Sequence, residues 1–418
     1  ASGMNTLDIA IVGYGSAGQA AALALSRDGH RVEVFEQAPR LRPVGAGFLL
    51  QPTGLSVLWE LGLLAPVLAQ GRRVDRLHGE NEAGRTVMDM RYAGLDPRLF
   101  GLGLQRGALF EVLRDAWPDA GRVRTDCRIT GVQEGGRRVV DERGRSHGPY
   151  DLVLAADGAA SSLRRELGPP RLDRAYPWGA LWCLLPEADW AWGGELRQRY
   201  RRAREMAGML PVGARPGDPT PRMSFFWSLP AAAMDDWPRG DLTGWKARAC
   251  RLWPALEPML EHVTEAGMLA RARYRDAIPA AWSKQRLVLV GDAAHAMSPQ
   301  LGQGVNMALL DVIALRDALR EPGGVEAALA RYGRSRRAHV AVYQFWSRWL
   351  TPVFQSDRDL VARLRDLAFL PAGRLPVGRG QMLRVLTGTQ RGWFGRLRLP
   401  EDFLEALAAA DGLSRGRG

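Results

Sequence analysis

The sequence has almost no lysine and very little cysteine, and it lacks any long apolar run. Of its 57 basic residues only Lys246 and Lys284 are lysines, which leaves 55 arginines spread along 418 residues. The net charge of +12 would suit a nucleic acid or an acidic membrane as partner. However, no run of arginines is interleaved with aromatic residues. We therefore interpret the arginines as a solvated basic surface and expect no nucleic-acid partner.

The three cysteines, at positions 127, 183 and 250, are far apart in the sequence. Neither a Cys-x-x-Cys pair nor a cluster of Cys and His is present, so we expect no metal site and no disulfide framework. No stretch of about 18 apolar residues is present either, so no integral membrane segment is expected. The apolar fraction of 46% is ordinary for a globular protein. Together these features predict a cytoplasmic protein of two to three domains.

The N-terminal segment reads as strand, glycine-rich turn, helix, strand and acid. The apolar run 7–12 predicts a buried strand, the segment 19–27 a helix, and the run 31–35 a second strand that ends at Glu36. A G-x-G-x-x-G turn between such elements binds a dinucleotide, with the pyrophosphate at the helix N-terminus and the acid on the adenosine ribose. The motif alone does not separate FAD from NAD. Its predicted contacts are Gly13, Gly15, Ser16, Ala17, Gly18 and Glu36.

Two further predicted strands end in polar motifs. The run 151–155 leads into Asp157-Gly158, the start of a D-G-x-x-S-x-x-R pattern that ends at Arg164. The run 286–290 leads into the sequence GDAAH at 291–295, then PQLGQGVN at 299–306, with a helix predicted from 305 to about 319. Open α/β sheets bind ligands at the carboxyl ends of their strands. Three motifs at strand ends would suit an extended cofactor that reaches beyond the site of a single glycine-rich turn.

In this order and spacing, the three motifs resemble the class A, single-component FAD-dependent monooxygenases, which include p-hydroxybenzoate and salicylate hydroxylases. The resemblance covers roughly residues 7–340. Two further stretches match it, namely VGAG at 44–47 and Gln105-Arg106 before a helix predicted over 107–116. The resemblance implies FAD bound tightly but non-covalently, NAD(P)H as a transient co-substrate, and O2 with a small-molecule substrate as partners.

The resemblance also assigns roles to single residues. Arg106 would contact the ribityl–phosphate region of FAD, and Asp292 the ribityl hydroxyls and the pyrophosphate side. Arg106 and Arg164 are candidates for steering the phosphates of FAD and NAD(P)H. The catalytic flavin environment would be formed by Pro299, Gly302 and Gln303, with no general base assigned. The remaining predicted cofactor contacts are Gly47, Asp157, Gly158, Gly291, Gly304, Val305 and Asn306.

The predicted fold is α/β. A Rossmann-like FAD-binding domain that carries G-x-G-x-x-G would comprise residues 4–75, 101–170 and 278–340. An inserted mixed or antiparallel β-sheet substrate domain would comprise 76–100 and 171–277, followed by a C-terminal helical segment at 341–418. Of the 14 tryptophans, nine lie between 178 and 282, which predicts a sheet with an aromatic wall. Its candidates for substrate contact are Trp182, Phe225 and Trp227.

The predicted function is a monooxygenase that uses NAD(P)H and O2 to hydroxylate or epoxidise an aromatic or other unsaturated small molecule through a flavin C4a-hydroperoxide. One alternative is an FAD-dependent reductase or dehydrogenase of the same fold that does not use oxygen. A flavin-dependent halogenase is disfavoured, because it needs a lysine beside its substrate tunnel and no lysine precedes residue 246. A monomer or a homodimer is expected, with the aromatic stretch 343–350 covering the FAD domain or a partner subunit.

Overall fold

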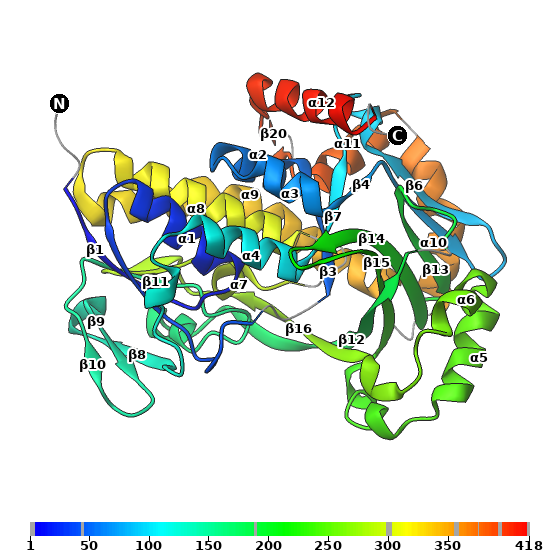
Figure 1. Cartoon of the computed structure of the whole chain (residues 1–418), viewed down its shortest axis with the longest axis horizontal. Helices are drawn as coiled ribbons and strands as arrows, with labels where there is room; N and C mark the ends of the chain where they lie inside the picture. The colour runs from blue at the N-terminus through cyan, green and yellow to red at the C-terminus, as the bar shows by residue number, and fades with distance from the viewer. Residues whose placement is uncertain are drawn as a thin grey trace.

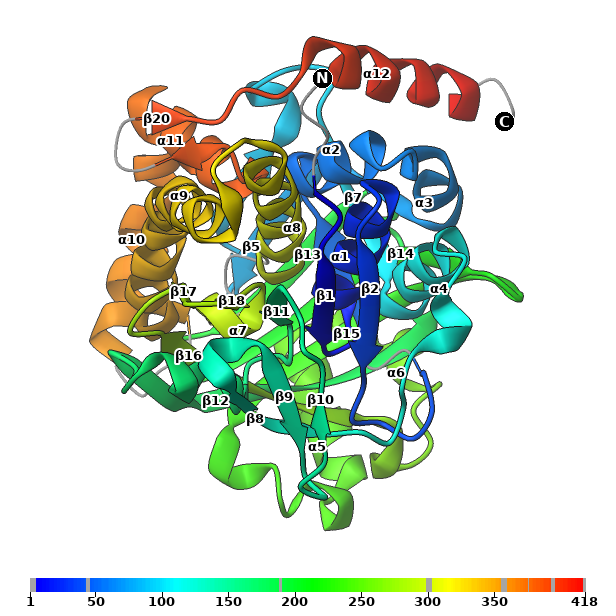
Figure 2. The ribbon, with the colours of Figure 1, turned by 90° about the vertical axis from the view of Figure 1, so that its left-hand side faces the viewer.

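A computed structural model describes residues 5–42, 46–187, 190–297, 303–354, 359–374, 376–391 and 395–415. Its first layer is a five-stranded sheet in the order β17-β18-β11-β1-β2 (Figure 2). The strands β1, β2, β11 and β18 run parallel, and β17 pairs antiparallel with β18. Their bounds are β1 (Asp8–Val12), β2 (Arg31–Phe35), β11 (Leu152–Ala155), β17 (Ser283–Lys284) and β18 (Leu287–Leu289). The four parallel strands therefore present their carboxyl ends, and the motifs that follow them, at one edge.

Four helices pack together beside this sheet. The first is α1 (Ser16–Arg27), whose alanines and leucines favour a helix and whose residues 18–25 are all buried. It contacts α4 (Arg106–Ala116) and α8 (Gly304–Arg320), and α8 contacts α9 (Gly324–Phe354). The predicted helices and parallel strands thus exist, and the α/β fold is confirmed.

The second layer is a seven-stranded mixed sheet in the order β16-β12-β15-β14-β13-β5-β6. It lies at the other end of the molecule from the five-stranded sheet (Figure 1). All neighbours pair antiparallel except β13 and β5, which run parallel. The bounds are β5 (Arg76–Asn81), β6 (Thr86–Arg91), β12 (Leu172–Pro186), β13 (Glu195–Arg201), β14 (Glu205–Arg215), β15 (Asp218–Pro230) and β16 (Ala270–Ile278).

A small sheet of β3 (Gly47–Leu50), β7 (Gly101–Gln105) and β4 (Arg72–Val74) lies against β14. Glycines allow this close approach. A Cβ on Gly103 would lie 1.7 Å from the carbonyl oxygen of Pro211. A fourth sheet consists of β8 (Ile129–Gln133), β9 (Arg138–Asp141) and β10 (Ser146–His147), which lie between β7 and β11 in the chain.

Further helices are α2 (Pro52–Glu60), α3 (Leu64–Gln70), α5 (Leu242–Leu252), α10 (Asp359–Arg374), α11 (Pro376–Thr387) and α12 (Glu401–Arg415). The predicted boundary at residue 340 falls inside α9, which continues to Phe354. Tyr343 on α9 has no exposed surface and belongs to the same hydrophobic cluster as β1, while the side chains of 348–350 lie outside the described part. Among the described residues, no helix is long and apolar enough to cross a membrane.

The close contact of β7 with β14 predicts the effect of a single methyl group. We expect Gly103→Ala to lower the melting temperature by several degrees, since the Cβ must displace a carbonyl and such overpacking costs about 1–3 kcal/mol. Gly121→Ala is the matched control, because a Cβ there meets nothing within 4 Å. Equal melting temperatures of the two variants would contradict the packing assigned to Gly103.

Candidate flavin site

The turn between β1 and α1 has the geometry that a pyrophosphate needs. Gly13 has φ +102°, and a Cβ there would lie 2.2 Å from the carbonyl oxygen of Ala156. A Cβ on Gly18 would lie 1.9 Å from the carbonyl oxygen of Gly13, so both positions exclude a side chain. Gly15, in contrast, faces open space. The middle glycine is therefore where the backbone can be approached by a ligand.

Glu36 stands directly after β2 and is held by backbone donors. Its Oε2 accepts the Tyr14 N–H at 2.8 Å, and its Oε1 accepts the Ala38 N–H at 2.9 Å. A carboxylate has about four acceptor sites, so two bonds leave capacity for hydroxyl donors. The geometry suits the ribose contact predicted for this side chain.

The loops after β11 and β18 are joined by the guanidinium of Arg164. Its Nη2 donates to the carbonyls of Ala159 and Asp292 at 2.8 and 2.9 Å, and its Nε donates to the carbonyl of Ala293 at 2.8 Å. The side chain has no exposed surface. Arg164 therefore supports the two loops from within and is not placed to steer phosphates, which corrects that part of the expectation.

The D-G and G-D residues themselves lie close to the glycine turn. Gly158 and Gly291 have φ +83° and +64°, the left-handed region that favours glycine. A Cβ on Gly291 would lie 3.1 Å from the Cβ of Ala17. Burial raises the pKa of Asp157, whose Oδ1 accepts the Ser161 hydroxyl at 2.5 Å. The structure thus brings three motifs, far apart in sequence, to one place.

Arg106 begins α4 beside β3 and faces the same region. Its backbone N–H donates to the carbonyl of Ala46 at 3.2 Å, next to Gly47. Its guanidinium carbon lies 5.3 Å from the centre of the Phe48 ring. The side chain is exposed, yet the surrounding protein lowers its pKa, while Asp292 and Tyr274 act in the opposite direction. An accessible charge surrounded by protein is what a cleft provides.

The side chain of Asn306 connects the amino-terminal end of α8 to the backbone at the end of β3 and just before α2. The Asn306 Oδ1 accepts the Gln51 N–H at 2.9 Å, and its Nδ2 donates to the carbonyl of Leu49 at 3.3 Å. Its side chain is therefore used inside the protein, which leaves the backbone for any flavin contact. Gln303 is buried, and Gly304 and Val305 are the first two residues of α8. The predicted Pro299 and Gly302 lie outside the described residues.

Comparison with known proteins identifies the family. The model of the FAD binding domain family matches residues 6–345. The chain belongs to this family. It is 30% identical to kynurenine 3-monooxygenase of Salinispora arenicola over 392 residues, which are 88% of this chain and 84% of that protein. It is 29% identical to 2-heptyl-3-hydroxy-4(1H)-quinolone synthase of Pseudomonas aeruginosa over 376 residues, which are 86% of this chain and 94% of that protein.

Among solved structures, PqsL of Pseudomonas aeruginosa superposes with a TM-score of 0.73 at 26% identity, over 88% of this chain and all of that one. The protein is thus a class A FAD-dependent monooxygenase, as the motifs predicted, and its cofactor is FAD. The oxygen-using function is favoured over the reductase alternative. Bound FAD supplies the chemistry that activates oxygen. The residues of the turn, Glu36, Asp292 and Arg106 would hold it.

In this flavoenzyme the predicted substrate residues lie on opposite faces of the seven-stranded sheet. Successive residues of a strand alternate between faces. Phe225 and Trp227, with 0% and 1% exposure, point to the face under α5 and pack in its core. A side chain without accessible surface lines no cavity that a ligand can enter. Trp182 is half-buried on the other face, opposite Phe226 and Ala270.

Two features of the flavoenzyme have no motif in the sequence that would indicate them. One is Tyr274 on β16, which interacts electrostatically with Arg106 although no motif surrounds it. The other is the C-terminal segment: the Gln303 Nε2 donates to the carbonyls of Val385 and Leu386 at 3.2 and 2.9 Å. The two contacts join residues that are more than 80 positions apart, so no local pattern could have indicated them.

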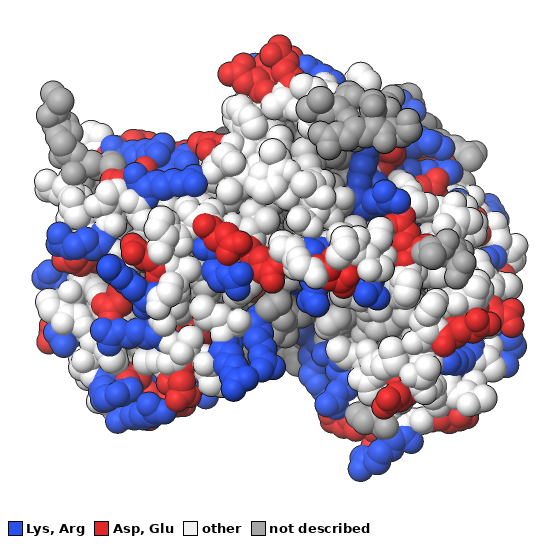
Figure 3. Space-filling view, in the orientation of Figure 1, with Lys and Arg blue, Asp and Glu red and all other residues white. Residues whose placement is uncertain are grey.

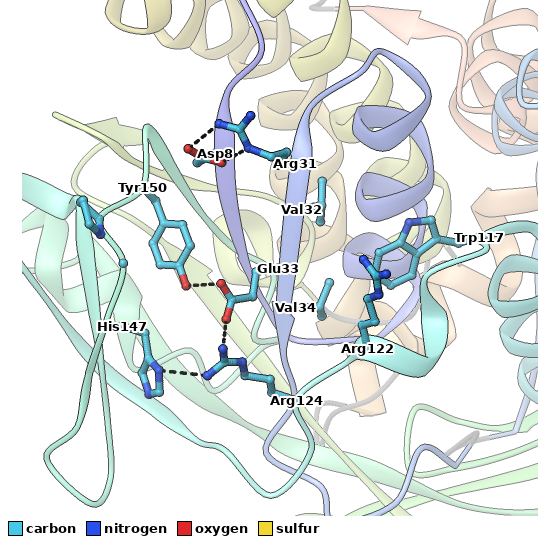
Figure 4. A pocket seen from close by; sticks show the side chains of 12 residues that line it. Asp8, Arg31, Val32, Glu33, Val34, Trp117, Arg122, Arg124, His147 and Tyr150 are labelled. Carbon is cyan, nitrogen blue, oxygen red and sulfur yellow. Dashed lines mark hydrogen bonds and ion pairs between the residues drawn. The ribbon is translucent and has the colours of Figure 1, made fainter.

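A separate hollow of about 550 Å³ lies along the edge strand β2 (Figure 4). Glu33 in its wall pairs with Arg124 at 2.7 Å and accepts the Tyr150 hydroxyl at 2.7 Å. Its lining residues on β2 are Arg31 to Val34, before the carboxyl end of the strand where the motifs meet. The hollow is thus distinct from the flavin site.

Next to this hollow, Cys127, Asp141 and His147 place possible metal-ligand atoms within 4.8 Å of one another. The Asp141 carboxylate is already paired with His147 at 3.0 Å and with Arg145 at 2.9 Å. These contacts hold the pKa of Asp141 well below its usual range. Because cations and backbone donors already surround the carboxylate, we assign no metal to this cluster.

The role of Asp292 can be checked by its removal. We expect Asp292→Ala to strip most of the FAD from the purified protein, because the variant loses the carboxylate that is expected to contact the ribityl and pyrophosphate region. The ratio of flavin to protein absorbance measures this loss. Asp236→Ala is the control, since that carboxylate is exposed and lies in the substrate-domain segment. Full FAD retention by Asp292→Ala would refute the assignment.

Proposed function

We propose that this monooxygenase uses NAD(P)H and O2 to hydroxylate a planar, nitrogen-bearing aromatic ring. The ring would lie between the flavin and the face of the seven-stranded sheet that carries Trp182. The observation that carries this proposal is the link between β16 and the loop after β18: the Ala277 N–H on β16 donates to the carbonyl of Ala296, just after the G-D motif, at 2.9 Å. β16 and the loop after β18 are therefore held next to each other, and we propose that the substrate binds where they meet.

The composition of that sheet face supports a flat apolar ligand. Trp182 stands opposite Phe226 in the pairing of β12 with β15, and Ala180 stands opposite Ser228. On β14, a Cβ on Gly208 would lie 1.9 Å from the ring of Phe226, so the absent side chain makes room for that ring. Aromatic and small residues with few polar groups are the usual lining of a small-molecule site.

Tyr274 supplies a polar group at the edge of this face. Burial raises the pKa of Tyr274 to about 12. Because a phenol is neutral below its pKa, Tyr274 keeps its proton throughout the neutral range and is suited to donate a hydrogen bond. We propose that it orients a substrate oxygen or nitrogen and does not act as a general base.

The relatives support the substrate class. Their names specify kynurenine and a heptyl-hydroxyquinolone, and PqsL has been solved in complex with 2-aminobenzoylacetate, at 25% identity to this chain and a TM-score of 0.71. These are aromatic rings that carry nitrogen on or in the ring. A dispersed surface charge also fits a small-molecule enzyme: basic and acidic groups are interspersed over most of the face shown in Figure 3.

The cellular setting is proposed from the cysteines. Cys127, Cys183 and Cys250 are all free thiols, and the first two are buried. Free thiols are typical of a reducing compartment, so we propose a cytoplasmic enzyme. We further propose that it binds FAD without a covalent bond and acts as a monomer or homodimer.

The reaction class is tested by stoichiometry. With a matching aminobenzoyl or quinolone compound, we expect NADH or NADPH oxidation and O2 uptake to accelerate together, and the product to gain one oxygen atom. Oxygen electrode traces and product mass spectra provide the measurement. A compound that is reduced or dehydrogenated without oxygen consumption would instead establish the reductase function.

The proposed substrate face is tested by side-chain removal. We expect Trp182→Ala and Tyr274→Phe each to lower kcat/KM about tenfold or more, equivalent to about 1.4 kcal/mol, at unchanged FAD content. Trp192→Ala is the matched control, because that half-buried tryptophan packs against Trp190 and Trp253 on the α5 side. Equal losses in the control and the two variants would contradict the assignment of this face.

A further inference from the structure

A buried carboxylate contacts the G-D loop but belongs to none of the sequence motifs. Asp311 on α8 has no exposed surface. Its Oδ2 accepts the Gly291 N–H at 2.8 Å and lies 2.5 Å from the Nε2 of His295. Its Oδ1 accepts the Nε of Arg336 at 2.7 Å. One side chain therefore joins the loop after β18, α7 (Asp292–His295) and α9.

The charges around Asp311 keep it ionised. Burial alone would favour the protonated acid, but His295 and Arg336 attract the carboxylate and donate hydrogen bonds to it. Their combined effect lowers the pKa of Asp311. An ionised acceptor makes stronger hydrogen bonds than a neutral one, so the Gly291 N–H is held firmly.

The hydrogen bond from Gly291 to Asp311 restrains the backbone next to Asp292. Gly291 has φ +64°, and it directly precedes Asp292. The orientation of the Gly291 peptide sets where the Asp292 carboxylate points. A Cβ on Gly304 would lie 3.7 Å from the Asp292 Oδ1, so that carboxylate also borders the start of α8. The bond from Asp311 thus fixes the backbone at the residue before Asp292.

The same network continues to the C-terminal segment. The Arg336 Nη1 lies 2.8 Å from the Nδ1 of His339, and the Nε2 of His339 lies 2.8 Å from the carbonyl oxygen of Gly388. Arginine can only donate and a carbonyl can only accept. His339 is therefore neutral, with its proton on Nε2. In this tautomer His339 accepts a hydrogen bond from Arg336 at Nδ1 and donates one to Gly388 from Nε2.

Residues 385–388 in turn contact the flavin-side elements. Gln303 donates to the carbonyls of Val385 and Leu386, and the Thr53 hydroxyl donates to the carbonyl of Thr387 at 3.2 Å. Segment 385–388 is thus held at two points. His339 contacts it at Gly388, and Gln303, the residue before α8, contacts it at Val385 and Leu386.

We propose that Asp311, Arg336 and His339 form a positioning relay that couples the C-terminal segment 385–388 to the Gly291–Asp292 loop and so sets how tightly FAD is held. None of the three touches the cofactor in this assignment. The relay acts through the peptide of Gly291 and through the placement of Gln303. The C-terminal region is therefore a working part of the flavin site.

The first test compares two carboxylates on α8 in the holoenzyme. We expect Asp311→Asn to raise the FAD dissociation constant, measured by recovery of flavin fluorescence on dilution, about tenfold. Asp317→Asn is the matched control: it removes a charge that pairs with Arg316 and Arg320 on the same helix, away from the G-D loop. We expect that control to stay within about twofold of the unmodified enzyme.

The second test uses His339 and remains decisive if Asp311→Asn does not fold. His339→Gln keeps an acceptor towards Arg336 and a donor towards Gly388, and should keep FAD affinity and the visible circular dichroism of the flavin. His339→Leu has neither group and should weaken FAD binding and alter that spectrum. Unchanged affinity in His339→Leu, or equal weakening in His339→Gln, would overturn the relay, because bulk packing would then explain the contacts.

Discussion

The guanidinium of Arg164 is fully buried and donates to backbone carbonyls of two loops that are about 130 residues apart in sequence. Removing a charge from water costs several kcal/mol unless hydrogen bonds compensate for it. Here three carbonyl contacts and Asp173 at 3.5 Å surround the cation. The loops after β11 and β18 are therefore fixed relative to each other, and the flavin contacts expected of them would depend on that spacing.

A second buried ion, Asp311, fixes the same G-D loop from the opposite side. The two ions differ in what they bind, because Arg164 satisfies carbonyls and Asp311 satisfies an N–H group. Together they satisfy the carbonyls of Asp292 and Ala293 and the N–H of Gly291. Exposed ion pairs contribute little, so these two buried ions fix the loop, whereas Arg106 and Asp292, the charged side chains expected to contact the cofactor, are exposed.

The seven-stranded sheet separates two functions by strand alternation. On β15, Phe225 and Trp227 stabilise the core under α5, whereas Phe226 between them faces the side of Trp182. The tryptophan-rich composition predicted an aromatic sheet correctly. It did not predict which aromatic residues share the face of Trp182, because a shift of one residue reverses the face and the register is set by pairing partners.

The sequence by itself determined the fold class, the cofactor and the oxygenase family, because each depends on short motifs in which glycines and acids must stand at fixed spacing after a strand. It also placed Glu36 and Gly291 correctly at the ends of β2 and β18. Only the tertiary structure decided that Arg164 is internal and that the carbonyls of Val385 and Leu386 accept hydrogen bonds from Gln303. These contacts join segments far apart in the chain, and their partners are selected by packing in three dimensions, which leaves no periodic or local signal in the sequence.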